Sequence, residues 1–208
     1  MLAYRPGTVV GTINGTQRPA AQFNKPKPSI TKPPEQSLPR AINYLADYSG
    51  CGYWRMAWPS HLVTAYQKVI TQDSTCMVRD DMFYNDIKTV RLQRQANPQQ
   101  LHFYKEICNL ARKKQFNVIY EIDDIVLSED IPDYNKYKFA FEPKEIRNSV
   151  IEMMQMSHEI TVTCEYMKDY YSSKTGNKNV TVIPNYPPRF WLDGFGRFWK
   201  VWEGFGRF

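Results

Sequence analysis

The sequence predicts an α/β domain with a doubly wound, mostly parallel sheet of about six strands. Two observations carry this prediction. Short apolar runs of strand length alternate with longer amphipathic segments across residues 41–184, an order typical of a parallel sheet covered by helices. The chain of 208 residues is 42% hydrophobic and 23% charged, so it is long and apolar enough to build a sizeable core.

The first part of this region should supply three strands and one helix. A helix is expected to begin near Pro59, because apolar residues recur there at helical spacing. These residues are Leu62, Tyr66, Val69 and Ile70. The strands are expected at residues 41–46, 75–78 and 89–92.

The second part repeats the strand and helix order more clearly. Pro98 opens a helix at its favoured first position, and a second helix should start at Pro143. A third helix begins at Glu165 and should stop before Gly176, because glycine is favoured just past a helix end. The strands are expected at residues 117–122, 159–163 and 180–183.

A basic arm, residues 1–40, precedes the predicted domain at residues 41–188. The arm holds seven of the fourteen prolines, and six Lys or Arg residues against the single acid Glu35. Such a composition cannot bury enough apolar surface to offset the ordering entropy, so we expect an extended segment. Its charge suits contact with nucleic acid, and the alternative is a solvated tail.

Residues 189–208 form an aromatic tail with an internal repeat. Asp-Gly-Phe-Gly-Arg-Phe at residues 193–198 recurs as Glu-Gly-Phe-Gly-Arg-Phe at residues 203–208. Nine of residues 186–208 are aromatic, which is more apolar area than a solvated tail normally carries. Three interpretations stay open: packing on the domain, binding of a partner, or the remnant of a frameshift or short duplication.

The cysteines and histidines are spaced too irregularly to predict a metal site. There is no C-x-x-C pair, and each histidine is isolated, which disfavours both a zinc site and a disulfide framework. No apolar run of about 18 residues occurs, which excludes a spanning helix, and the first residues lack the apolar region of a secretory signal. We therefore expect a cytoplasmic protein without a bound metal or cofactor.

Ligand-binding residues are expected at the carboxyl ends of the strands, where doubly wound sheets bind ligands. The first candidate is the loop after the first strand. Gly50 and Gly52 would let the backbone approach a phosphate closely, and Arg55 could add a bidentate contact. The alternative is a tight strand-to-helix turn, because Arg55 stands where a G-x-G-x-x-G motif has its third glycine.

The second candidate is the carboxylate pair Asp123 and Asp124, directly after the best strand in the chain. These side chains could serve as a catalytic base, as acceptors for sugar hydroxyls or as magnesium ligands. The alternative is that they cap the following turn. The loop that follows carries aromatic residues that could stack on sugar or base rings, or pack as an ordinary hydrophobic loop. These are Tyr134, Tyr137, Phe139 and Phe141.

Four motifs follow one another along the domain. They are G-C-G-Y-W-R-M-A-W-P from residue 50, Y-E-I-D-D-I-V from residue 120, S-H-E-I-T-V-T-C-E-Y-M from residue 157 and N-V-T-V-I-P-N-Y-P-P from residue 179. In this order they resemble the N-terminal half of GT-B glycosyltransferases of the glycosyl-transferase-group-1 type, and the variants of bacteriophages and bacteria look closest. The resemblance covers about residues 41–191.

The resemblance implies a Rossmann-like, acceptor-binding domain, with a nucleotide sugar as donor substrate and no metal or cofactor. It places Gly50 and Gly52 near the donor phosphates, with Tyr53 and Arg55 beside them. Asp123 and Asp124 would face the cleft as catalytic residues, and Tyr134 would join the acceptor site. A phage source would add modified DNA bases as acceptors and the host cytoplasm as location.

The chain departs from this family after Pro188, because only twenty residues follow where a second Rossmann domain is expected. We therefore expect the acceptor-side half of a transferase, nearly inactive alone, with a partner chain as one source of the donor domain. The alternative function is a non-catalytic binding or assembly module. Such a module would use the basic arm and the aromatic tail to contact nucleic acid or protein.

Overall fold

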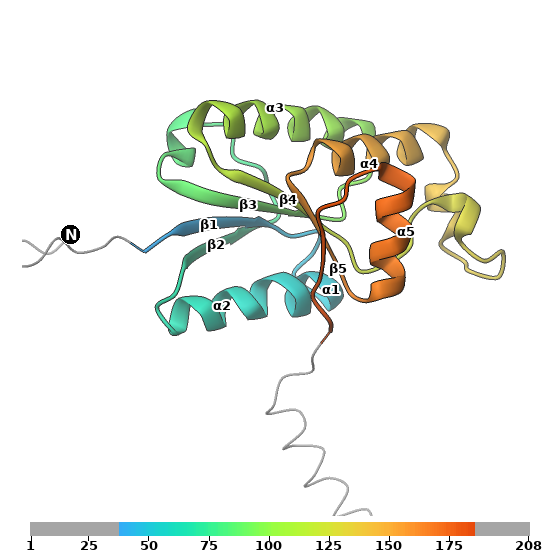
Figure 1. The fold of residues 1–208 in the computed structure, drawn as a ribbon, viewed down its shortest axis with the longest axis horizontal. Helices are drawn as coiled ribbons and strands as arrows, with labels where there is room; N and C mark the ends of the chain where they lie inside the picture. Colours follow the sequence, from blue (N-terminus) through green and yellow to red (C-terminus); the bar gives the residue numbers. More distant parts are fainter. Residues whose placement is uncertain (1–37, 186–208) are drawn as a thin grey trace, which may run out of the picture. The chain divides into compact units, whose positions relative to one another are not determined.

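Six parallel strands form the centre of the protein, for which the computed structural model describes residues 38–185 (Figure 1). The strand order is β2-β1-β3-β4-β5-β6, and every neighbouring pair is parallel. This confirms the predicted fold class, a Rossmann-like α/β sheet. The strands are β1 Arg40–Tyr44, β2 Ile70–Ser74, β3 Ile87–Gln93, β4 Asn117–Glu121, β5 Glu159–Val162 and β6 Val180–Val182.

Helices connect the strands. The main ones are α2 Trp58–Ala65, α3 Pro98–Lys114, α4 Lys144–Met156 and α5 Glu165–Thr175. Shorter segments are α1 Gly50–Gly52, η1 Tyr53–Ala57, η2 Asp81–Tyr84, η3 Ser128–Asp130 and η4 Lys138–Phe141. Segment η1 is a π-helix that joins α1 to α2, so residues 50–65 form one continuous helical stretch.

The helix ends follow from local sequence. Asn97 caps α3 by accepting a hydrogen bond from the Gln100 backbone N–H at 2.8 Å, and the Gln100 side chain accepts from the Asn97 backbone in return. Pro98 takes the first helical position, as expected. Gly176 ends α5 with a left-handed φ of 75°, which glycine adopts without steric cost.

The two faces of the sheet receive different helices. The path β3, β4, β5, β6 steps across the sheet in one direction, so right-handed crossovers put α3, α4 and α5 on one face. The step from β1 to β2 runs the other way and puts α2 on the opposite face, below the sheet in Figure 1. The main core lies under α3, α4 and α5 and includes Val90, Tyr120 and Met153, all fully buried.

One strand prediction is wrong. The second strand lies at Ile70–Ser74 and not at residues 75–78, so Val69 and Ile70 also fall outside the helix whose face they were expected to share. Strand β2 is polar and half-exposed because it is the edge of the sheet. The apolar signal at residues 75–78 comes from a loop: Met77 packs on the main core, and Val78 binds the Tyr44 and Tyr84 hydroxyls.

The other predicted strands and helices are present, with ends shifted by a few residues at most, and Arg40 already belongs to β1. Most of the predicted arm, residues 1–37, and the whole tail at residues 189–208 lie outside the described residues. No helix within residues 38–185 is long and apolar enough to cross a membrane.

Candidate functional site

The site lies where the path of the chain reverses direction across the sheet. β1 and β3 are neighbours, but the chain leaves β1 toward α2 on one face and leaves β3 toward α3 on the other. In doubly wound sheets this switch point, at the carboxyl ends of the strands, is where ligands bind. The loops that meet here follow β1, β3 and β4.

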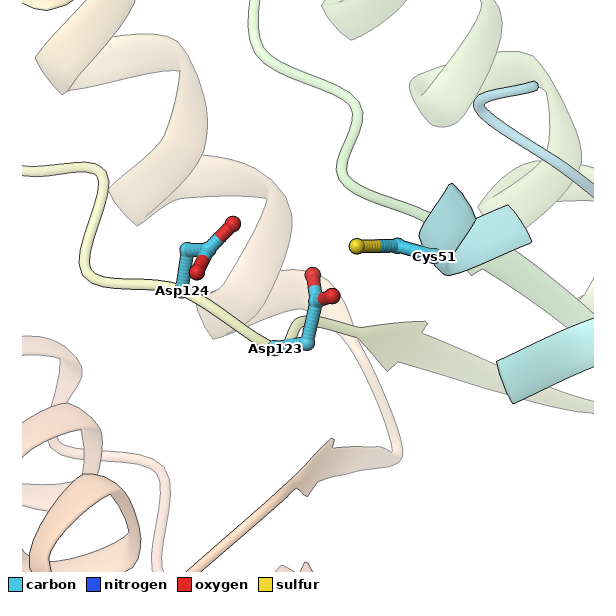
Figure 2. A group of neighbouring side chains, drawn as sticks. All are labelled: Cys51, Asp123 and Asp124. Atoms are coloured by element: carbon cyan, nitrogen blue, oxygen red, sulfur yellow. The ribbon is translucent and has the colours of Figure 1, made fainter. Parts of the chain in front are cut away.

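Three potential ligand side chains converge at the switch point. The Cys51 Sγ and one carboxylate oxygen each of Asp123 and Asp124 all lie within 4.8 Å of one another. Figure 2 shows the thiol pointing from α1 toward the two carboxylates on the loop after β4. The structure thus joins the two regions that the sequence singled out separately.

Arg94, which the sequence analysis missed, ties this group together. Its Nη1 lies 3.2 Å from the Asp124 Oδ2, and its Nη2 lies 3.6 Å from the Asp47 Oδ2. Its backbone φ is 44°, a left-handed conformation that is uncommon for a non-glycine residue and recurs at functional sites. One guanidinium therefore bridges the loops after β1 and β4 from a strained position after β3.

The protonation of the site follows from burial and from charge crowding. Burial, then the neighbouring Asp123 carboxylate, raises the pKa of the Cys51 thiol to about 11, so the thiol is neutral. Burial, then the neighbouring Asp123 charge, raises the pKa of Asp124, while Arg94 opposes this rise. The Asp123 Oδ1 is buried and has no hydrogen-bond partner within residues 38–185.

Asp123 and Asp124 thus differ in what they can still bind. Asp124 is engaged by Arg94, whereas the Asp123 Oδ1 is unpartnered within residues 38–185 but buried, so a ligand could reach it only if the surrounding loops opened. A metal ion would have to compete with Arg94 for Asp124 and displace the Cys51 proton. Thiolate and carboxylate also favour metals of different softness, so the set fits a hydroxyl donor better than a cation.

Gly50 and Gly52 are both required by the turn itself. Gly50 has a φ of 43°, and a Cβ at Gly52 would lie 1.8 Å from the Asp47 carbonyl oxygen. The Asp47 side chain in turn accepts a hydrogen bond from the Ser49 N–H at 2.8 Å. The left-handed backbone at Gly50 and the close approach at Gly52 explain the two glycines without a ligand, and the predicted contact with donor phosphates stays a prediction.

Arg55 is buried, and the structure uses its guanidinium within the domain. Its Nε is paired with Glu121 of β4, and its Nη1 donates to the Ile183 carbonyl and to the Asn185 Oδ1, both at 2.8 Å. Arg55 therefore links η1, β4 and the segment after β6. Only its Nη2 lacks a hydrogen-bond partner within the described part of the chain.

The two tyrosines predicted for the site lie in different surroundings. Tyr53 is half-buried and packs on the small cluster formed by Leu45 and by Met56 and Ala57 of η1. Tyr134 is 90% exposed on the loop between η3 and η4, and Tyr137 of the same loop and Phe139 of η4 are also exposed. Phe141 instead packs against the main core, so the four aromatic residues do not form one surface.

Of the missed residues, Arg94 and Asp47 had a usable signal. Each lies just past the carboxyl end of a strand, the position where binding residues are expected in this fold. Cys51 had none, because a lone cysteine between two glycines has no characteristic spacing. No protein-family model, no curated protein and no solved structure matches this chain, so the site is interpreted from its geometry.

Proposed function

We propose that this domain is the acceptor-side half of a GT-B-type glycosyltransferase, in which Asp123 accepts a hydrogen bond from the reacting hydroxyl. The observation that carries the proposal is the division of roles between two adjacent carboxylates at the switch point. Asp124 is held by Arg94, while the Asp123 Oδ1 has no partner within residues 38–185. Once an opening of the loops after β1 and β4 exposes this oxygen, it would orient a sugar hydroxyl and take its proton.

The chemistry assigns one task to each group. As the hydroxyl oxygen bonds to the anomeric carbon of the donor sugar, its proton passes to Asp123 and the nucleoside diphosphate leaves. Arg94 fixes Asp124 beside the reacting group, and the first turn of the helical stretch at Gly50 faces the departing phosphates. Nucleotide-sugar binding would come largely from a second domain or a partner chain, so we expect little transfer by the 208-residue chain alone.

Calorimetry with variants of this chain tests the proposal. The probes are UDP-glucose, UDP and methyl glucoside, titrated into the wild-type chain, Asp123→Asn and the control Asp133→Asn. The amide in Asp123→Asn keeps the size and turn-forming ability of the carboxylate but loses its charge, whereas the side chain of Asp133 is 97% exposed and pairs with Lys138. In Asp123→Asn we expect the affinity for methyl glucoside, which supplies the acceptor hydroxyl, to fall about tenfold or more. A tenfold loss corresponds to roughly 1.4 kcal/mol. Asp133→Asn should bind as the wild-type chain does.

Two outcomes would contradict the proposal. One is the absence of binding by every probe to the wild-type chain. The other is unchanged affinity in Asp123→Asn, which would favour the turn-capping interpretation, because Asn caps about as well as Asp.

The alternative function, a binding or assembly module, is supported by the exposed aromatic residues Tyr134, Tyr137 and Phe139. Together with the basic arm they suit single-stranded nucleic acid, where bases stack on aromatic rings and cations contact phosphates. Fluorescence anisotropy with a labelled oligonucleotide tests this function. Tight binding that weakens with salt and is lost in Tyr134→Ala would favour the module over the enzyme.

A further inference from the structure

The two faces of the sheet are covered unequally by residues 38–185. Neighbouring strands carry in-register residues that share a face. On the face under α3, α4 and α5, one such row of in-register residues consists of Leu92, Tyr120 and Ile160, all fully buried. On the opposite face of β3–β6, here called the open face, Gln93, Glu121 and Thr161 are buried, whereas six other residues are half-buried or exposed. These are Thr89, Arg91, Asn117, Ile119, Glu159 and Thr181.

The helix on the open side covers only part of it. Asn43 of β1 donates to the Ser60 Oγ of α2 at 2.6 Å, and Thr71 of β2 donates to the Ser60 carbonyl at 3.1 Å, so α2 lies over β1 and β2. Figure 1 shows α2 below the sheet, on the side of β1 and β2, with α3 and α4 above. Segment η1 extends this cover only to Glu121, which it reaches through Arg55.

Polar groups on the open face lack partners. The side chain of Arg91 donates no hydrogen bond and makes no ion pair within residues 38–185, although burial lowers its pKa. In the next row toward the carboxyl ends, the Gln93 Nε2, the Glu121 Oε2 and the Thr161 Oγ1 are buried without hydrogen-bond partners in the described part of the chain. Those three atoms are already inaccessible, whereas the half-buried Arg91 side chain is not. Because buried polar groups are normally satisfied, a segment that covers this face should carry acceptors for Arg91.

The chain leaves β6 toward this face. Ile183 continues the strand pairing by donating its N–H to the Val162 carbonyl at 2.7 Å. The Ile183 carbonyl and the Asn185 side chain are then held by Arg55, which reaches them from the open side of β4. The described part of the chain therefore ends, at Asn185, beside the open face.

We propose that residues 186–208 pack across the open face of β3–β6 and complete the second layer of the domain. These 23 residues include nine aromatic residues, with arginines and acids between them, so they offer both apolar cover and partners for Arg91 and Glu159. An extended segment of this length spans roughly 75 Å at about 3.3 Å per residue. The width from β3 to β6 is only about 15 Å at about 4.8 Å per strand.

Paramagnetic relaxation in the full chain tests this packing. A nitroxide is attached at Thr181→Cys on the open face or, as the control, at Arg112→Cys, an exposed residue of α3 on the opposite side. Cys51, Cys76 and Cys164 are replaced by Ser in both chains, so that only the buried Cys108 remains. The readout is the indole N–H signals of Trp191, Trp199 and Trp202, assigned by single Trp→Phe replacements.

We expect the label at Thr181 to broaden the tail indole signals and the label at Arg112 to leave them sharp. Asn117→Cys, a second exposed position on the open face, should repeat the effect and serves if the Thr181 variant does not fold. Tail signals that stay sharp with the open-face labels, or broaden equally with the Arg112 label, would overturn the proposal. A mixing experiment gives a further contradicting outcome. If nitroxide-labelled chain broadens the tail indole signals of a separate ¹⁵N-enriched chain that carries no nitroxide, the tail lies on a second copy.

Discussion

At the scale of single residues, the site depends on side chains from distant parts of the sequence that meet at one edge of the sheet. Asp123 and Asp124 could be singled out in advance, because acids directly after a buried strand are poorly solvated and need partners. Which residues they would meet could not be predicted, although Arg94 and Asp47 lie just past the ends of strands. The convergence of Cys51, Arg94 and Asp47 on them depends on strand order, and strand order is a tertiary property.

Arg94 should control the ionisation of Asp124. Burial and the Asp123 charge raise the pKa of Asp124, and the Arg94 guanidinium lowers it. In Arg94→Ala that opposing charge is gone, so the pKa of Asp124 should rise further, and the carboxylate should take up its proton at a higher pH. Carboxyl ¹³C NMR titration measures this change. Lys138→Ala, which removes the partner of the exposed Asp133, is the control and should leave Asp124 unaffected; an unchanged or lower pKa in Arg94→Ala would refute the ion pair.

Arg55 should matter more for stability than any exposed ion pair. Its side chain and that of Glu121 are 4% and 0% exposed, and removing one partner leaves the other charge buried. Such losses typically cost about 3–5 kcal/mol. We expect urea unfolding of Arg55→Ala to show a decrease of this size, against about 0–1 kcal/mol for Arg147→Ala, which breaks a half-exposed pair with Glu129. Equal effects of the two replacements would mean that Arg55 is not a structural link.

At the scale of elements, the strongest local signals gave the correct predictions. α3 has a proline at its first position and a capping pair around it, and β4 has the apolar residues 118–120 at its centre, so both were found close to their true ends. β2 was misplaced because an edge strand need not be apolar, and Ile70–Ser74 is mostly polar. Propensity and periodicity report burial, and they fail where a strand is exposed or a loop is buried.

The turn between β1 and the helical stretch makes a prediction at this scale. A Cβ at Gly52 would lie 1.8 Å from the Asp47 backbone, which cannot move without displacing the loop after β1, whereas a Cβ at Gly50 meets nothing within 4 Å. Gly52→Ala should therefore lower the free energy of unfolding by more than the roughly 1–2 kcal/mol expected for Gly50→Ala, whose cost is the left-handed backbone alone. Urea unfolding of both variants measures this order. A Gly50→Ala chain that is less stable than Gly52→Ala would contradict the packing described for this turn.

At the scale of the whole molecule, the alternation of strands and helices was enough to predict a parallel, doubly wound sheet. The side on which each helix packs, and hence the position of the switch point, needed the observed order β2-β1-β3-β4-β5-β6. The role of Arg55 as an internal link could not be predicted either, because the sequence contains no sign that Glu121 and Asn185 would approach it. The fold therefore shows mainly which side chains, distant in the sequence, contact one another.

The central claim is that the carboxyl edge of β1, β3 and β4 is the ligand-binding site. The most direct measurement is a ¹H–¹⁵N NMR titration of the full chain with UDP-glucose and, separately, with methyl glucoside. We expect the amide signals of residues 47–52, 94–95 and 122–124 to shift first and furthest. Shifts that are absent from these residues and concentrated elsewhere, for example along α2 or at Tyr134, would contradict it.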